Sequence, residues 1–392
     1  MLTAMKIKLK PTKEQEVLFW KSAGVARWAY NYFIAESNKH YDEYLKGNRE
    51  TKTIKESDVR KHINNVLKNT THTWLREVGS NVMKQAVKDA DMARKRWFDG
   101  VADKPRFKSK RHSKISFYVN YESLRRTKEG FQGEKIGIVR TYQALPKLKD
   151  GQKYSNPRIS FDGKSWFLSV GYEKKLELFE LTGERLGIDV GIKELAVCSD
   201  GETKGNINKT HAVKQIEKKL KREQRKLSRK LEANIKSRDK NQRPIYIKPL
   251  KDMRNIQKQN QIIRNLHKKL NDIRTNHLHQ CSSEIVKIKP SRIVMETLNV
   301  KGMMKNKHLS KAIAGQKLNE FKRQIQYKCQ KYGIEFVEAD KWYPSSKTCS
   351  CCGRIKSDLK LKDRVFICEC GFKLDRDLNA SINLANYQIQ RT

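Results

Sequence analysis

Three acidic residues far apart in the chain, Asp189, Glu296 and Asp377, have the type and setting to hold divalent metal ions. Asp189 interrupts the apolar run LGIDVGI, where a carboxylate costs desolvation energy unless a cation meets it. Its small glycine neighbours predict room for a bulky ligand. Glu296 ends the β-branched run RIVMET, and Asp377 falls in the first turn of a predicted helix, where the dipole favours an anion.

Carboxylate oxygens are the ligands that magnesium or manganese prefers. Two such ions activate a water and stabilise the leaving oxygen at a scissile phosphate. Each acid also fits a simpler role: Asp189 in a hairpin turn, Glu296 at an exposed strand end, and Asp377, or its rival Asp375, as a helix N-terminal charge. No Walker-type glycine loop, Ser-His-Asp set or Rossmann fingerprint competes for the chemistry.

A cysteine cluster is the second feature with metal chemistry, in the pattern CSCCG followed further on by CECG. Two short Cys-containing turns that end in glycine are typical of a zinc ribbon, in which four thiolates surround the ion. We assign Cys349 and Cys352 from the first turn and Cys368 and Cys370 from the second, with Cys351 as a spare candidate. The alternative is a set of incidental buried or redox cysteines.

The charge balance points to the partner. Lys and Arg total 85 against 43 Asp and Glu, a net charge of +42, and a polyanion would relieve the resulting self-repulsion. Nucleic acid is the expected partner, and a membrane surface is the weaker alternative. No apolar run reaches the roughly 18–20 residues that span a bilayer, and the N-terminus has no signal-peptide pattern. We therefore expect an intracellular protein with reduced cysteines.

The first half of the chain predicts a β-barrel with a helical insertion. A basic strand at 5–10 precedes a helical region over 12–100, which Thr12 opens in a capping box with Gln15. Residues 115–175 then change to a β pattern, with a hairpin signal at Asp162-Gly163.

The sequence of the second half predicts strands that alternate with helices, and this half is long enough to form a separate domain. Two strands are expected over 183–200 and others at 291–300 and 333–340; Asp189 lies in the first of these segments and Glu296 in the second. The expected helices cover 211–238, a second arm of a basic helical hairpin containing Ile256 to Ile273, then 311–332 and 375–389.

Three segments are candidates to contact nucleic acid. The polar face of the predicted helix over 80–98 carries Asn and Gln, which can read adenine edges, and Lys, which reaches guanine or phosphate. A basic loop over 104–114 and the helix over 214–238 are candidate phosphate contacts, and the alternative for all three is an ordinary solvated surface. The candidates are Asn81, Lys84, Gln85, Lys88, Tyr118 and Asn120 for reading bases, and Arg106, Lys108, Lys110, Arg111, Lys218, Arg222, Arg225 and Arg229 for phosphates.

Four separated motifs, in order, resemble those of TnpB, a family of transposon-encoded RNA-guided nucleases related to the type V CRISPR effectors. They are GIDVGIKELAVCSDG, IVMETLNVKGM, SSKTCSCCG with FICECG, and DRDLNASINL; the opening KIKLKPTKEQEVLFWKSAGVARWAYNYF and the PRFKSK loop are similar as well. In this resemblance Asp189 and Glu296 match the first two RuvC carboxylates. Asp377 matches the third, because the family pattern is Asp-x-Asn and Asn379 follows. The second cysteine turn is shorter than the commoner family spacing.

The resemblance implies an α/β multidomain fold with an RNase H-like RuvC nuclease, a zinc ribbon, and a β-barrel wedge domain that carries an inserted helical recognition domain. The implied boundaries are 1–11 and 113–180 for the wedge barrel, 12–112 for the recognition domain, 181–342 for the nuclease with its basic hairpin at 209–280, 343–372 for the zinc ribbon and 373–392 for the C-terminal nuclease helix.

The resemblance further implies a guide RNA derived from the transposon end, double-stranded target DNA, magnesium or manganese, and zinc. The protein would read a short motif beside the target, and the guide would pair with one strand before the RuvC site cuts. It implies a prokaryotic, cytoplasmic protein near the nucleoid that acts as a monomer on its RNA. Two other functions stay open: an RNA-independent transposase, and a guided DNA-binding repressor with a silent nuclease.

Overall fold

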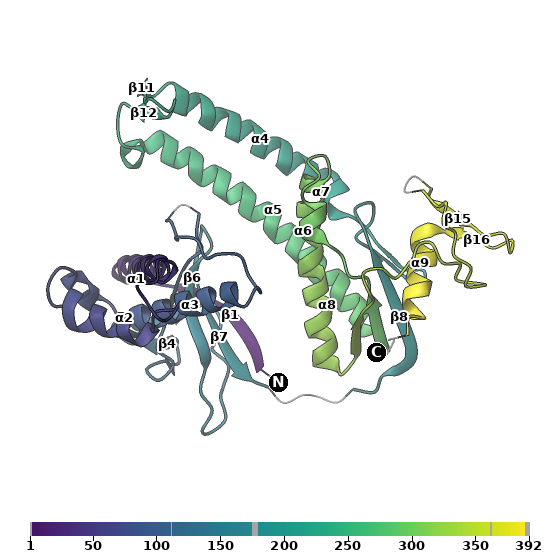
Figure 1. Ribbon diagram of the computed structural model, residues 1–392, viewed down its shortest axis with the longest axis horizontal. Coiled ribbons are helices and arrows are strands. Elements are labelled where there is room, and N and C mark those ends of the chain that lie inside the picture. The colour runs from purple at the N-terminus through teal and green to yellow at the C-terminus, as the bar shows by residue number, and fades with distance from the viewer. Residues whose placement is uncertain (1, 111, 175–178, 361–362, 389–392) are drawn as a thin grey trace. The chain divides into compact units, whose positions relative to one another are not determined.

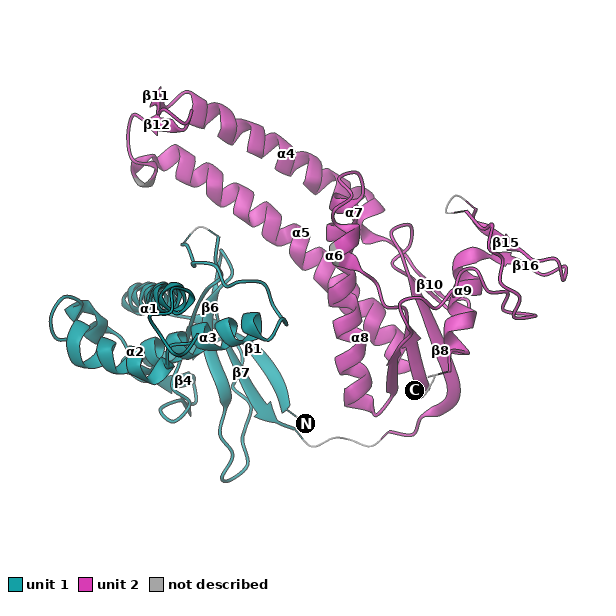
Figure 2. Ribbon diagram, in the orientation of Figure 1, with its two compact units in different colours: residues 1–175 teal, residues 176–392 magenta. Residues whose placement is uncertain are grey.

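The computed structural model describes residues 2–110, 112–174, 179–360 and 363–388 (Figure 1). The chain divides into two compact units, Met1–Lys175 and Leu176–Thr392 (Figure 2). Within the described residues, no helix combines the length and the apolar character that crossing a membrane requires.

The helices of unit 1 follow the strand β1 and pack on one another. The predicted capping box is confirmed: the Thr12 hydroxyl accepts from the Gln15 backbone N–H at 3.3 Å, and the Gln15 side chain accepts from the Thr12 N–H at 3.1 Å. It fixes the start of the first helix. The helical elements are α1 (Lys13–Leu45), α2 (Glu56–His62), the π-helical turn η1 (Ile63–Leu67), the 3₁₀ turn η2 (Thr73–Glu77) and α3 (Ser80–Phe98).

One antiparallel sheet of seven strands makes up the rest of unit 1, in the order β2-β6-β7-β1-β5-β4-β3. The predicted basic strand lies inside it, and the predicted hairpin joins β6 to β7, where the Asp162 carboxylate accepts from the Ser165 N–H at 2.9 Å. No pairing joins β2 to β3 among the described residues, so strand pairing gives an open sheet and no closed barrel. The strands are β1 (Leu2–Lys10), β2 (Ile115–Tyr118), β3 (Arg125–Arg126), β4 (Gly130–Gly133), β5 (Gly137–Thr141), β6 (Ser155–Phe161) and β7 (Trp166–Glu173).

Unit 2 contains a mixed sheet in the order β10-β9-β8-β13-β14. The strands β8, β9 and β10 are antiparallel, while β13 and β14 run parallel to β8. One face packs on α5 and α8 through a core that includes Ile188, Ile285 and Phe321, and the other packs on α9 through Val294 and Leu384. The elements are β8 (Thr182–Val190), β9 (Ala196–Cys198), β10 (Thr203–Lys204), β13 (Pro290–Met295), β14 (Glu335–Glu338), α5 (Arg254–Lys287), α8 (Leu318–Tyr332) and α9 (Arg376–Ala385).

A helical hairpin interrupts this unit, and its first helix is shorter than predicted. The sequence predicts helix to residue 238, but α4 ends at Glu232 because Asn234 caps it: its side chain donates to the Lys230 carbonyl at 2.7 Å, and its own carbonyl accepts from Ile247. The chain then forms the two-stranded tip that joins α4 to α5. The elements are η3 (Ile207–Lys209), α4 (His211–Glu232), β11 (Ile235–Arg238), β12 (Pro244–Tyr246) and η4 (Leu250–Asp252).

The single helix predicted over 311–332 is wrong, because the structure contains two helices there. They meet at Lys317, which adopts the left-handed conformation with φ of 55°. Its ammonium donates to Asn271 at 2.8 Å and to Thr275 at 2.7 Å on α5, so tertiary bonds support the break. The remaining elements of unit 2 are α6 (Val300–Met303), α7 (Ser310–Gln316), β15 (Val365–Ile367) and β16 (Lys373–Asp375).

Candidate active site and metal centre

Asp189 and Glu296 lie at the same edge of the unit 2 sheet. The strands β8 and β13 are parallel neighbours, with Met295 paired to Ile188, so their carboxyl ends meet. The backbone N–H of Val190 donates to the Glu296 carboxylate, which holds this side chain against the end of β8. The carboxyl edge of parallel strands is where open α/β sheets bind ligands.

The third acid comes from α9, which covers the sheet face that Asp189 shares with Gly187. Asp375 and Asp377 occupy different positions at the start of α9, and the charges of both raise the pKa of Asp189. The Asp375 carboxylate is the N-cap of α9, because it accepts from the backbone N–H groups of Asp377 at 2.9 Å and Leu378 at 3.2 Å. Asp377 interacts electrostatically with both Asp189 and Glu296.

Gly187 fills a different role from the one predicted. We expected the glycines beside Asp189 to leave room for a ligand, but the space at Gly187 is occupied by α9. A Cβ at this position would lie 1.9 Å from the Ser381 carbonyl oxygen and 2.4 Å from the Ala385 nitrogen. The glycine therefore permits the close approach of α9 that carries Asp377 to the sheet.

The electrostatics of the site favour a cation. Burial raises the pKa of Asp189 well above its ordinary value, and the charges of Glu296 and Asp377 raise it further. Burial also raises the pKa of Glu296 to about 7, with Asp377 adding to the rise and the Val190 N–H opposing it. Arg376, with its guanidinium 3.5 Å from the Asp377 carboxylate, opposes the rise at Asp189. Asp189 and Glu296, whose raised pKa values oppose ionisation, would ionise readily around a bound cation.

The acids are spread more widely than the ligands of a single ion. Among the described residues, only the four cysteines form a group of three or more such ligands that all lie within 4.8 Å of one another. Two divalent ions sit about 3.5–4 Å apart in phosphoryl-transfer sites and need a wider ligand set than one ion does. The three acids fit a two-ion site in their chemistry and in their place at the sheet edge.

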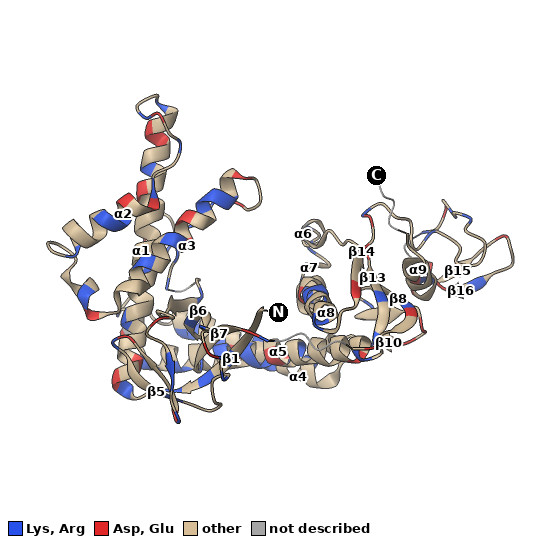
Figure 3. Cartoon of the chain, turned by 90° about the horizontal axis from the view of Figure 1, so that it is seen from below, with Lys and Arg blue, Asp and Glu red and all other residues tan. Residues whose placement is uncertain are grey.

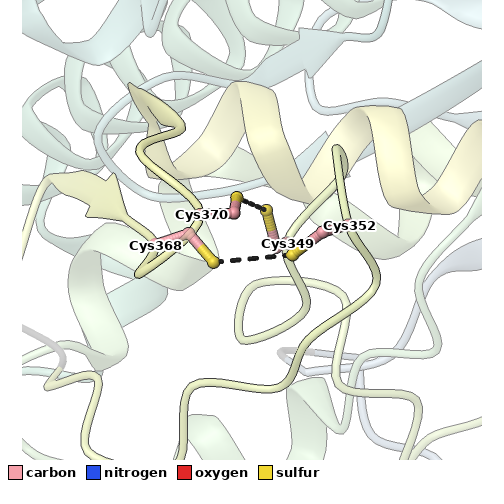
Figure 4. A group of neighbouring side chains, drawn as sticks. All are labelled: Cys349, Cys352, Cys368 and Cys370. Carbon is pink, nitrogen blue, oxygen red and sulfur yellow. Dashed lines mark hydrogen bonds between the residues drawn. The ribbon is translucent and has the colours of Figure 1, made fainter.

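The cysteine assignment agrees with the geometry. Cys349, Cys352, Cys368 and Cys370 point toward one another (Figure 4), with the Cys349 and Cys370 sulfurs 3.8 Å apart and those of Cys352 and Cys368 3.6 Å apart. Four thiolates at the usual zinc–sulfur distance form a tetrahedron with edges of about 3.8 Å, so these residues fit zinc. Cys351 is exposed and lies outside the group.

Electrostatics also suit Cys349 to bind a metal as the thiolate. Burial raises the pKa of its thiol, but the backbone N–H groups of Cys352 and Cys351, together with hydrogen bonds from the Cys352 and Cys368 side chains, outweigh burial and lower it to about 7. The cluster packs against Phe366, which is fully buried in a core of very few residues. A metal bound by the four cysteines would add stability to so small a core.

Two buried asparagines of α9 join the helix to the first cysteine turn, a connection that the sequence analysis missed. The Thr348 carbonyl accepts from the amide of Asn379 at 2.7 Å and from that of Asn383 at 2.6 Å. The Asn379 oxygen accepts from the Ser350 N–H at 3.0 Å, and Asn383 also donates to the Ser345 carbonyl at 2.8 Å. The polar spacing Asn-x-x-x-Asn on an otherwise apolar helix face was the available signal.

We expect Asn383→Ala to loosen the first cysteine turn, because the buried Ser345 carbonyl would lose its donor at a cost of about 1–3 kcal/mol. The Thr348 carbonyl would keep only its bond from Asn379. Amide hydrogen exchange of a peptide covering 345–352 should become faster in the variant. Asn386→Ala is the control, since Asn386 is exposed at the end of the same helix. Unchanged exchange in Asn383→Ala would contradict the role of this bond.

Three of the six residues proposed to read bases line the same hollow, and the other three do not. Asn81, Tyr118 and Asn120 line one shallow hollow of unit 1. On α3, Lys88 is exposed while Lys84 and Gln85 are half-buried. Gln85 is already engaged, since its amide donates to Asp89 at 3.0 Å.

The proposed phosphate contacts differ in accessibility. Arg106 and Lys110 are exposed, but Lys108 is partly buried with its ammonium 3.6 Å from the Tyr30 ring centroid, and burial lowers its pKa. Arg111 lies outside the described residues. The four α4 candidates are all exposed at helical spacing along one side of the helix: Lys218, Arg222, Arg225 and Arg229.

Three family models match parts of this chain. They are described as "Helix-turn-helix domain" over residues 1–46, "Probable transposase" over 169–307 and "Cas12f1-like, TNB domain" over 319–384. The last match includes the four-cysteine group and most of α9.

Several curated proteins are similar over most of the chain. A Streptomyces pristinaespiralis protein named "Putative RNA-guided DNA endonuclease" is 27% identical over 388 residues, which covers 97% of this chain and 88% of the relative. InsQ of Escherichia coli (strain K12), with the same name, is 26% identical over 414 residues, covering 98% and 91%. "TnpB-like protein L79" of Acanthamoeba polyphaga mimivirus is 28% identical over 206 residues, or 50% of this chain and 36% of that protein.

Solved structures also align with the chain. A Cas12f1–sgRNA–target DNA complex aligns over 98% of this chain and 99% of that chain, at 18% identity and a TM-score of 0.37. A mini-RNA-guided endonuclease, CRISPR-Cas_phi3, aligns over 98% and 92%, at 10% identity and a TM-score of 0.42. Both superpositions are too loose to establish a shared fold.

Proposed function

We propose that this chain is a TnpB-like, RNA-guided DNA endonuclease that hydrolyses a phosphodiester bond at the acid site of unit 2. The observation that carries this proposal is the convergence of Asp189, Glu296 and Asp377, from two strands and a helix, at one edge of a sheet. The mixed strand order of unit 2 suits the RNase H-like RuvC fold that the family motifs imply.

The three carboxylates would hold two magnesium or manganese ions, which supply an activated water and a stabilised leaving oxygen. Glu296 stays in place through its bond from Val190, and Asp377 through the capped first turn of α9. Arg376 provides positive charge beside these acids, which limits their repulsion before a cation binds. The four cysteines would hold zinc and stabilise the segment that leads into α9.

The guide RNA and target DNA would be held mainly through phosphates. A polyanion would relieve the self-repulsion of a net charge of +42, and basic side chains occur on helices of both units, α3 and α8 among them (Figure 3). An RNA–DNA heteroduplex is bound through its backbone and shape, so base reading is needed only at a short motif beside the target. The hollow with Asn81, Tyr118 and Asn120 is our candidate for that reading.

We expect the affinity for Mg²⁺ to rise with pH, because the carboxyls must ionise to bind it. The pKa of Glu296 is about 7, so the affinity should rise up to about tenfold per pH unit below pH 7 for each proton displaced. A carboxyl whose folded pKa is raised stabilises the fold at low pH, and this contribution is lost as pH rises toward 7. Without Mg²⁺ the unfolding temperature should therefore fall over this range, and Mg²⁺ should restore it.

Thermal unfolding at several Mg²⁺ concentrations between pH 5.5 and 8 measures both effects without any assay of cleavage. A magnesium response that does not change with pH would contradict the proposed ligation by Asp189 and Glu296.

An RNA-independent transposase is the second candidate, because the match over 169–307 is described as "Probable transposase" and the same acids would serve DNA strand transfer. Sequencing of RNA that co-purifies with the protein separates the two. We expect one abundant RNA species with a variable end. A preparation free of nucleic acid that cleaves DNA at full rate would overturn the guided function.

A further inference from the structure

Trp342 presents an aromatic ring to solvent in a way that no packing requirement explains. Its relative exposure is 79%, and no other large apolar side chain among the described residues is exposed as much. It is also the single tryptophan of unit 2, since the other five lie between residues 20 and 166. Burying a tryptophan is strongly favourable, so one held in solvent is a candidate for binding.

The position of Trp342 relates it to the acid site. The strand β14 ends at Glu338, and the next residue, Ala339, donates its N–H to the Met295 carbonyl at 2.8 Å. The Thr297 hydroxyl in turn donates to the Ala339 carbonyl at 2.6 Å. Glu296 lies between Met295 and Thr297, the two residues that bond to Ala339. The loop with Trp342 therefore leaves the sheet beside Glu296.

Hydrogen bonds fix this loop at both ends. The Trp342 backbone N–H donates to the Asp340 carboxylate at 2.7 Å, and the Asp340 N–H donates to the Tyr387 hydroxyl at 3.2 Å. The Tyr343 hydroxyl donates to the Asn383 carbonyl at 3.1 Å, and its ring meets that of Tyr387 edge to face. The backbone that carries the exposed ring is therefore held against α9, the helix of Asp377.

A cation occupies one face of the ring. The Lys341 ammonium lies 4.6 Å from the centroid of the Trp342 ring. This contact adds positive charge next to an aromatic surface and leaves the opposite face for another planar group. Single-stranded nucleic acid is recognised by this combination of stacking surface and positive charge.

We propose that Trp342 stacks on an unpaired base of the DNA strand at the acid site and so positions the scissile phosphate. This proposal rests on the proposed nuclease function. Double-stranded DNA leaves its bases paired and stacked, so such a contact selects a strand that has already been separated. Trp342 is thus a positioning residue, and Lys341 supports its ring orientation.

The test combines substitutions of Trp342 with abasic sites in the target DNA and measures the cleavage rate of each combination. The protein is assembled with its co-purified RNA. Trp342→Ala should slow cleavage by about tenfold or more, while Trp342→Phe should stay close to the wild type. DNA targets that carry a single abasic site at successive positions near the cut should show one position that slows the wild type. At that position the abasic site should not slow Trp342→Ala further.

Ile355→Ala is the matched control, because Ile355 is an exposed apolar residue of the first cysteine turn, 59% accessible. It should cleave as the wild type does. Equal rates for Trp342→Ala and the wild type, or abasic effects that add fully to the Trp342→Ala effect, would overturn the proposal. Both outcomes are observed with a wild-type protein that cleaves under guide control. A wild type that does not cleave would instead contradict the proposed nuclease function.

Discussion

Replacing Asp189 with asparagine is expected to lower the rate of DNA cleavage by a factor of about 10³ or more. Burial raises the pKa of Asp189, and the charges of Glu296 and Asp377 raise it further. Asparagine keeps the shape of the side chain but removes the charge that would hold a metal ion. Metal ions contribute several kcal/mol to such a transition state, which corresponds to this loss of rate.

Two further properties separate loss of the metal site from misfolding. Guide-directed binding of DNA should be unchanged in Asp189→Asn, because the proposed phosphate contacts lie on other elements such as α4. Without Mg²⁺ the variant should unfold at a higher temperature than the wild type, since like charges beside Glu296 and Asp377 are reduced. The rise in unfolding temperature on adding Mg²⁺ should shrink or disappear. Cleavage by Asp189→Asn at the wild-type rate would contradict the assignment of Asp189 to the active site.

Gly187→Ala is expected to disrupt the site without touching any acid. The added methyl group would lie 1.9 Å from the Ser381 oxygen and 2.4 Å from the Ala385 nitrogen, and both are backbone atoms that cannot rotate away. Therefore α9 must move from β8, and Asp377 moves with it. Overpacking of this kind costs typically about 1–3 kcal/mol, and displacement of about 1 Å at a catalytic group costs about 10²-fold in rate.

Gly183→Ala on the same strand is the matched control, because nothing lies within 4 Å of a Cβ at that position. We expect Gly187→Ala to have a lower unfolding temperature and about 10²-fold slower cleavage, while Gly183→Ala keeps both properties. The measurements are thermal unfolding and the rate of target cleavage under saturating guide RNA. Equal behaviour of the two variants would contradict the close approach of α9.

Asp189 and the four clustered cysteines could be singled out in the sequence because each stands out locally. An acid inside LGIDVGI is costly without a cation, and two cysteine turns ending in glycine are recognisable in any context. The choice of Asp377 over Asp375 came from a family motif and stays a prediction; in the structure the Asp375 carboxylate caps α9.

The parts that could not be predicted depend on contacts between distant segments. Gly187 looked like space for a ligand, since nothing in the sequence indicates that α9, nearly 200 residues later, occupies that space. The break at Lys317 depends on acceptors from α5, and the sequence around it is compatible with a continuous helix. The end of α4 at Glu232 had a local signal in Asn234, but the apolar spacing that continues to Ile235 outweighed it.

The most direct test of the account is reprogramming of cleavage by the RNA. The protein is purified with its RNA, the variable end of that RNA is replaced by a sequence matching one of two DNA targets, and cleavage is measured with and without Mg²⁺. We predict that the cut moves to whichever target the RNA matches, requires Mg²⁺, and is lost in Asp189→Asn. Cleavage of both targets irrespective of the RNA sequence, or equal cleavage without RNA, would contradict an RNA-guided nuclease.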